Sequence, residues 1–145
     1  MTLPAPVLLD TDTLSAVLCR NLLVTQPVYE YLRLHRRLSF SMITRYEILR
    51  GLKARGATGQ QRAFESFCAT NSVLPLTDAV VVRAADIYAN LHQRGELIGD
   101  ADILIAATAM VEERTLVTNN RRHFDRVEDL RVENWLEDNN GEETL

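Results

Sequence analysis

The sequence has few cysteines, a single lysine and no long hydrophobic segment, and these shortages exclude several classes of protein. Its two cysteines, Cys19 and Cys68, lie far apart and match no metal-binding spacing, so we expect reduced thiols in a cytoplasmic protein. No apolar run approaches the roughly 20 residues that span a bilayer, so no membrane association is expected. The apolar residues 3–9 have no basic residue before them and are followed at once by Asp10 and Asp12, which argues against a signal peptide.

The length and composition are typical of one soluble globular domain. The chain has 145 residues, of which 46% are hydrophobic and 25% charged, and this excludes disordered and low-complexity proteins. It shows no internal repeat and no linker. We therefore expect one domain over residues 1–136, followed by an acidic C-terminal tail, residues 137–145, that is frayed.

The net charge of −4 conceals an uneven distribution of charge. Residues 128–145 hold seven of the 20 acids and one base, whereas residues 1–127 hold 15 bases and 13 acids. Lys53 is the only lysine among the 16 basic residues. Each arginine cluster alone is typical of a solvated helix face. Because the planar guanidinium suits phosphate, the pattern is also compatible with an acidic site fringed by arginine.

Short apolar segments alternate with segments of helical periodicity. The strands are expected at residues 7–9, 38–41, 72–76, 116–118 and 130–135, the last as a strand or extension. The helices are expected from Asp12 or Thr13 to residue 20, from a first turn at Pro27 to residue 37, and at 45–54, 60–70, 78–94 and 102–110, with a turn or short helix at 121–124. This alternation predicts an α/β fold with a mostly parallel central sheet.

Several acids stand in apolar surroundings, where a charge is unfavourable unless it is paired or used. Asp10 ends a buried strand, Glu47 lies among apolar helix residues, Asp100 and Asp102 open the buried helix, and Asn120 follows the fourth strand. Sites in open parallel sheets form at the carboxyl ends of the strands, so we expect these residues to converge there. Carboxylates with an amide favour Mg²⁺ or Mn²⁺ over Zn²⁺.

Each of these residues also has a purely structural interpretation. Asp10 fits a turn after a strand, and Asp12 fits an ordinary helix N-cap. Glu47 fits a surface ion pair with Arg50, three residues later on the same helix. Asp100 and Asp102 suit a helix N-terminus for electrostatic reasons alone. Taken singly, these interpretations are favoured, and the joint occurrence of the acids in this order favours a site.

Four segments in this order carry a resemblance to a known family. They are LLDTDTLS with Asp10 and Asp12, SMITRYEILRG with Glu47, IGDADILIAATA with Asp102, and TLVTNNRRHFDRV with Asn120. Each segment is a weak signal and the set is a strong one. Together they resemble PIN-domain proteins, specifically the VapC-type toxins of bacterial toxin–antitoxin pairs. The resemblance spans residues 7–127. It departs from the family's pattern of four acids at Asn120, so the number of bound metal ions, one or two, stays open.

The resemblance implies a PIN-like three-layer αβα sandwich, a homodimer, an Mg²⁺-dependent endoribonuclease acting on RNA, and a cognate antitoxin protein. Hydrolysis of a phosphodiester requires an activated water and stabilisation of the leaving oxygen, and these two requirements suggest a role for each residue. Asp10 and Asp102 are expected to bind the metal directly, with Glu47 as a water-mediated ligand or the base. Asn120 would hold a metal-bound water or a phosphate oxygen. Asp100 would supply the carboxylate that is absent because position 120 holds an asparagine. The hydroxyls expected to support these ligands are Thr11, Thr44 and Thr118.

Two alternatives remain. The segment Asp10-Thr11-Asp12-Thr13 also fits the opening motif of haloacid-dehalogenase-like phosphatases, with Asp10 as nucleophile and Lys53 as the only available lysine. The other alternative is a non-catalytic RNA-binding module on the same fold. The replacement of an acid by Asn120 favours that module, whereas the three remaining acids favour an enzyme.

Overall fold

The structure is a computed structural model that describes residues 5–137. Its strands and helices follow one another along the chain in the α/β order predicted from the sequence. They are β1 (Val7–Leu9), α1 (Thr11–Leu18), α2 (Leu22–His35), β2 (Ser39–Ser41), α3 (Met42–Ala54), α4 (Thr58–Thr70), β3 (Ser72–Leu74), α5 (Asp78–Gln93), α6 (Asp100–Val111), β4 (Thr115–Val117), α7 (Arg121–Phe124) and β5 (Val132–Glu133).

The five strands form one sheet in the order β3-β2-β1-β4-β5, and every pairing is parallel. Strand β1 lies at the centre, with Leu8 opposite Leu116 of β4 and Leu9 opposite Phe40 of β2. The chain runs outward from β1 to β3 on one side and then crosses back to β4 on the other. The strand order therefore reverses between β1 and β4, which is where open parallel sheets form their binding crevices.

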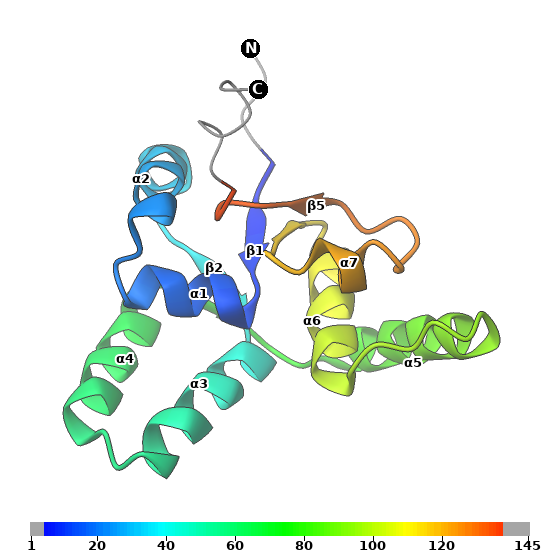
Figure 1. Cartoon of the computed structure of the whole chain (residues 1–145), viewed down its shortest axis with the longest axis horizontal. Coiled ribbons are helices and arrows are strands. Elements are labelled where there is room, and N and C mark those ends of the chain that lie inside the picture. Colours follow the sequence, from blue (N-terminus) through cyan, green and yellow to red (C-terminus); the bar gives the residue numbers. More distant parts are fainter. Residues whose placement is uncertain (1–4, 138–145) are drawn as a thin grey trace.

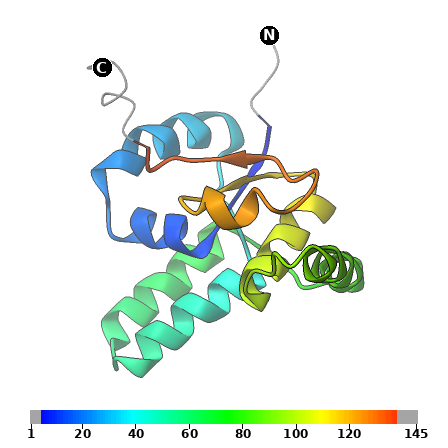
Figure 2. The same cartoon turned by 45° about the vertical axis from the view of Figure 1, so that its right-hand side comes forward.

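Helices cover both faces of the sheet (Figures 1 and 2). Successive residues of a strand point to opposite faces, and β1 shows this clearly. Leu8 packs into a core with α5 and α6, whereas Val7 and Leu9 pack into a second core with α1, α2, α3 and α4. The predicted three-layer αβα architecture is confirmed. No helix within residues 5–137 is long and apolar enough to cross a membrane.

The observed helices begin earlier than the sequence predicted at two places because a different residue caps each of them. Asp10, rather than Asp12 or Thr13, caps α1, and its carboxylate accepts the Thr13 N–H at 2.8 Å. Ser41 caps α3 through the Thr44 N–H at 3.1 Å, so α3 begins at Met42 and Thr44 lies within its first turn. In both cases the cap is the last polar residue of the strand or the residue just after it.

The prediction that Pro27 opens a helix was wrong. Asn21 caps α2 by accepting the Leu23 N–H at 2.8 Å, so the helix begins at Leu22 and Pro27 lies inside it. Proline has no N–H, so the Leu23 carbonyl lacks its usual helical donor at this point. The strong cap at Asn21 starts the helix despite that loss. The predicted acidic tail, residues 137–145, falls outside the described residues except for Glu137.

A buried tyrosine on α2 satisfies the first N–H of the central strand. The Val7 N–H donates to the Tyr31 hydroxyl at 3.1 Å, and both residues are buried. The Tyr31 ring lies 5.8 Å from the ring of Trp135 near the end of the described chain. Tyr31 therefore joins α2, β1 and the segment after β5.

Replacing Tyr31 by phenylalanine should leave the buried Val7 N–H without its partner. We expect Tyr31→Phe to lower the free energy of unfolding by about 1–3 kcal/mol, measured by urea denaturation. The matched control is Tyr29→Phe, because Tyr29 is on the same helix and 62% exposed. Equal midpoints for the two variants would show that the Tyr31 hydroxyl contributes no stability.

Candidate active site

The candidate site lies at the carboxyl ends of β1 and β4, where the strand order reverses. Asp10 follows β1 directly, and Thr118 follows β4 directly. The Asp10 N–H donates to the Val117 carbonyl at 3.0 Å, and the Thr13 hydroxyl donates to the same carbonyl at 3.3 Å. These bonds extend the pairing of the two strands beyond their ends, so they fix where the Asp10 carboxylate lies.

Asp10 is a buried acid, only 4% exposed. Burial raises the pKa of its carboxyl above the ordinary value of 3.8, and the negative charge of Asp12 adds to the rise. Hydrogen bonds from Thr118 and Thr13 lower the pKa in the opposite direction. The structural interpretation of Asp10 is therefore correct in part, because this carboxylate caps α1, and it is also a charge held away from water.

Glu47 is held by a hydroxyl group from another helix, α1. The Thr11 hydroxyl donates to Glu47 Oε1 at 2.6 Å and lies 3.1 Å from the Thr44 hydroxyl. The predicted ion pair with Arg50 is also present, with Arg50 Nη2 3.5 Å from Glu47 Oε2. Glu47 thus has one oxygen held by Thr11 and the other oriented toward a solvent-exposed arginine.

Asp102 and Asn120 meet through a histidine. Asp102 Oδ2 lies 3.6 Å from His123 Nδ1, and the Asn120 amide nitrogen lies 2.9 Å from the same Nδ1. Burial raises the pKa of Asp102, and His123 lowers it through a hydrogen bond and its charge. The negative charges of Glu47 and Asp12 add to the rise, so these acids act on one another across the site.

The structure places four of the predicted site residues in contact with other residues of the site and leaves one outside. The four are Asp10, Glu47, Asp102 and Asn120, through the contacts described above. Asp100 is exposed in the first turn of α6 and makes no hydrogen bond or ion pair within the described chain. Among residues 5–137, no three His, Cys, Asp or Glu side chains already have the arrangement of a metal site.

Sequence reasoning missed the part that Asp12 plays. Asp12 was assigned to a helix cap, but it is exposed and its charge raises the pKa values of both Asp10 and Asp102. Its position two residues after Asp10 was the available signal. His123 lies three residues after Asn120, so the sequence predicts that it is near the site, but not that it contacts Asp102, which lies on another helix.

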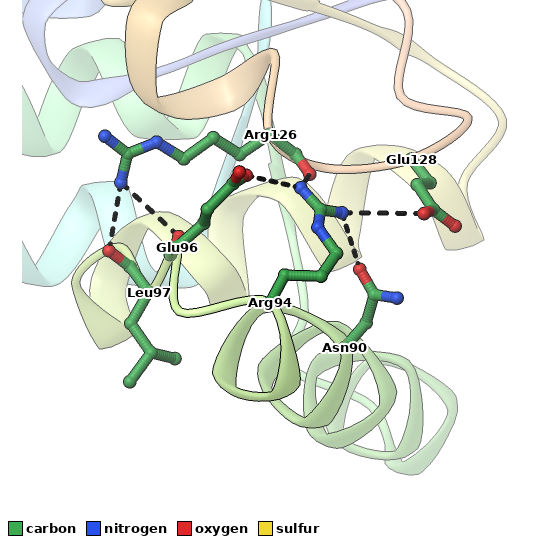
Figure 3. A network of polar contacts seen from close by, with 6 residues as sticks. All are labelled: Asn90, Arg94, Glu96, Leu97, Arg126 and Glu128. Atoms are coloured by element: carbon green, nitrogen blue, oxygen red, sulfur yellow. Dashed lines mark hydrogen bonds and ion pairs between the residues drawn. The ribbon is translucent and has the colours of Figure 1, made fainter.

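Arg94 and Arg126, which lie outside the site, join the loop before α6 to the segment after α7 (Figure 3). Arg126, which follows α7, donates to the backbone carbonyls of Glu96 and Leu97 at 3.3 and 3.2 Å. Arg94 donates to the Arg126 carbonyl at 2.8 Å and pairs with Glu96 and Glu128. The loop that leads into α6 is therefore joined to the segment after α7, which keeps Asp102 and His123 on adjacent elements.

These features define an α/β protein with a wholly parallel sheet and an acidic site at its point of strand reversal. Residues 7–130 match the family model described as PIN domain, and the chain belongs to the PIN domain family. The family resemblance drawn from the four sequence segments is thereby confirmed.

Relatives and solved structures agree with this assignment. Ribonuclease VapC10 of Mycobacterium tuberculosis is 30% identical over 125 residues, which cover 86% of this chain and 90% of the relative. Ribonuclease VapC1 of Methanocaldococcus jannaschii is 31% identical over 92 residues, 63% of this chain and 65%, just under two thirds, of the relative. The structure of VapBC-1 from nontypeable Haemophilus influenzae is similar with a TM-score of 0.80 at 26% identity, covering 90% of this chain and 98% of that one.

The raised pKa of Asp10 predicts a pH-dependent effect of its charge on stability. A carboxyl whose pKa is higher in the folded state binds its proton more tightly there, so its ionisation destabilises the fold as the pH rises. We expect Asp10→Asn, which keeps an N-cap acceptor, to be more stable than the wild type at neutral pH in EDTA. The difference should vanish as the pH falls toward 3.8. Thermal unfolding across that range measures it, and a constant difference would contradict the prediction.

Proposed function

We propose that this protein is an Mg²⁺- or Mn²⁺-dependent endoribonuclease that acts as the toxin of a toxin–antitoxin pair. The observation that carries the proposal is the electrostatic coupling of Asp102 with Glu47 and Asp12, beside the buried Asp10, in a chain of the PIN domain family. Among the described residues, the cationic partners of these acids are the solvent-exposed Arg50 at Glu47 and His123 at Asp102, and a divalent cation would stabilise the acids further. The relatives named above are ribonucleases.

The donor set fits a hard divalent cation in its chemistry, because the acids and Asn120 offer oxygen ligands. Asp10 and Asp102 would bind such an ion directly, and Asp100 would add a carboxylate from the exposed side. An Mg²⁺ ion bound there supplies charge neutralisation for the leaving oxygen and activation of the attacking water. Glu47, oriented by Thr11, would accept the proton of the attacking water. The Asn120 amide would hold a water or a phosphate oxygen.

The hydroxyl residues have supporting parts in this proposal. Thr11 donates to Glu47, and Thr44 lies within hydrogen-bond distance of Thr11. Thr118 contributes a hydrogen bond to Asp10 and accepts the Asn120 N–H at 2.9 Å. These contacts would fix the rotamers of the ligands before any ion binds, which increases affinity for it.

The two alternative functions have less support. A phosphatase of the haloacid-dehalogenase type would need a lysine beside Asp10, and Lys53 is exposed in the last turn of α3 while the hydrogen bonds of Asp10 go to Thr13 and Thr118. A non-catalytic module would need Asp10 only as the cap of α1 and would have no use for Asp102, whose pKa is also raised by burial.

The proposed chemistry predicts RNA cleavage that depends on metal and on both proposed metal ligands, the buried Asp10 and the half-buried Asp102. Asp10→Asn and Asp102→Asn should each reduce the rate by about a hundredfold or more, and EDTA should abolish cleavage. The measurement is the rate of cleavage of labelled RNA in Mg²⁺ and in Mn²⁺. Asp86→Asn, an exposed acid in the middle of α5, is the matched control and should keep the wild-type rate.

The product ends separate this mechanism from one that uses the ribose hydroxyl. Attack by water should leave a 5′-phosphate and a 3′-hydroxyl. A mechanism through the 2′-hydroxyl needs a general acid and base, most often two histidines, and within residues 5–137 the histidine described in contact with a site acid is His123. His123→Ala should therefore keep the same ends at a changed rate. Cyclic-phosphate ends formed in excess EDTA would overturn the metal mechanism.

We further propose a cognate antitoxin and a homodimer in the cytoplasm. The solved relative from H. influenzae is a VapBC structure, and VapBC pairs are described as toxin–antitoxin systems. The exposed Val81 and Val82 on α5 offer an apolar surface that a second copy would cover. Light scattering of the purified chain measures its oligomeric state.

An antitoxin should neutralise the acidic site with a cation of its own. We expect expression of this chain to arrest growth and co-expression of its proposed antitoxin to relieve the arrest. An arginine or lysine of the antitoxin, inserted among the acids, would neutralise their charge. A crystal structure of the complex checks the contact. An antitoxin that inhibits fully without approaching Asp10, Glu47 or Asp102 would contradict this.

A further inference from the structure

The exposed side of α3 carries a stripe of large side chains beside the acidic site. Met42, Tyr46 and Arg50 follow one another at spacings of four residues, so they lie on one face of the helix. Met42 is 42% exposed and Tyr46 is 59% exposed, although both could bury considerable apolar area. Tyr46 directly precedes Glu47, so the stripe borders the site.

Arg50 connects the Tyr46 ring to the site. Its guanidinium carbon lies 5.2 Å from the centroid of the Tyr46 ring, and its Nη2 lies 3.5 Å from Glu47 Oε2. The Arg50 side chain is 58% exposed, so this ion pair is weak and leaves N–H donors facing solvent. Arg45 on the same helix differs, because it donates to Glu65 and Cys68 and is occupied by the fold.

The two side chains have the chemistry that binds an unpaired nucleotide. A solvent-exposed aromatic ring offers a stacking surface for a base, and a guanidinium offers paired donors to a phosphate. A phosphate chain approaching the acids is repelled by them, and a cation at the border of the site offsets that repulsion. Arg121 and Arg122, both exposed on α7, lie next to Asn120 on the other side of the site.

We propose that Tyr46 and Arg50 bind one nucleotide of single-stranded RNA next to the cleavage site, with the base stacked on Tyr46 and the phosphate on Arg50. The inference rests on the proposed nuclease function and names two residues that bind and orient the RNA at that site. A base within a duplex has both faces covered by its neighbours, so only an unpaired one reaches the ring. Tyr46 and Arg50 act in binding and in orienting the RNA strand toward Glu47.

The chain holds a matched control for this pair. Tyr88 on α5 is 45% exposed, and its ring stacks at 5.9 Å with that of His92, four residues later. Tyr88 is thus an exposed tyrosine with a neighbour at the same spacing, but its described contacts include none of the site acids. Tyr88→Ala removes an equal ring from another surface.

The test is binding measured without cleavage. The full chain carrying Asp102→Asn is titrated with a short fluorescent single-stranded RNA that contains 2-aminopurine, and with a hairpin of the same composition. Adding Tyr46→Ala should weaken single-strand binding roughly tenfold and remove the quenching of 2-aminopurine, whereas Tyr46→Phe should keep both. Arg50→Gln should reduce the slope of log affinity against log salt by about 0.7, and Arg50→Lys should restore that slope.

In the active protein, Tyr46→Ala should raise KM for single-stranded RNA more than it lowers kcat. Tyr88→Ala should change neither binding nor KM. Failure of the proposed function would appear as no hydrolysis by the wild type, which the binding titration does not depend on. Three outcomes would overturn the inference: no binding of RNA by the Asp102→Asn chain, equal losses for Tyr46→Ala and Tyr88→Ala, or an equal effect of Tyr46→Ala on binding of the hairpin.

Discussion

The Asp10 carboxyl group is buried where water hardly reaches it, and much of the local structure provides the hydrogen bonds that water would otherwise give. Its oxygens are satisfied by the Thr13 N–H and by Thr118, which come from the start of α1 and the end of β4. The same contacts begin a helix and hold two central strands in register. The partners of Asp10 belong to a helix and a strand of the core, so the carboxylate cannot move unless the sheet also moves. The site is therefore as rigid as the core.

The other acids are arranged around that fixed point by small hydroxyl residues. Thr11 links the β1 side of the site to Glu47 on α3, and Asn120 and His123 link the β4 side to Asp102 on α6. Thr11 is a neutral donor to Glu47, and the cationic partners of these acids are the solvent-exposed Arg50 beside Glu47 and His123 beside Asp102. The arginines that offset the negative field lie outside, in the network of Arg94 and Arg126 and on the exposed faces of α3 and α7.

Most of the architecture could be predicted because apolar strands and amphipathic helices have different periods. The positions of the five strands and their parallel arrangement follow from that difference. Helix starts were harder, because polar residues such as Asp10, Asp12 and Thr13 compete for one cap and the backbone after the strand decides between them. The acids of the site could be named from their apolar surroundings and order. Thr11, Thr44 and Thr118 could be named as supporting hydroxyls, but which acid each partner contacts could not, since Thr11–Glu47 and Asp102–His123 join residues distant in the chain.

The order of the strands has a consequence during synthesis of the chain. Strand β4 lies beside β1 at the centre of the sheet, yet it is made after α6, when most of the protein already exists. Until residues 115–118 leave the ribosome, β1 has one unpaired edge and Asp10 lacks the hydrogen bond from Thr118. Asp10 and Glu47 are translated early, and Asn120 and His123 late. A ribosome that stalls before β4 therefore releases a chain that holds Asp10, Glu47 and Asp102 but neither Asn120 nor His123, so the site stays incomplete.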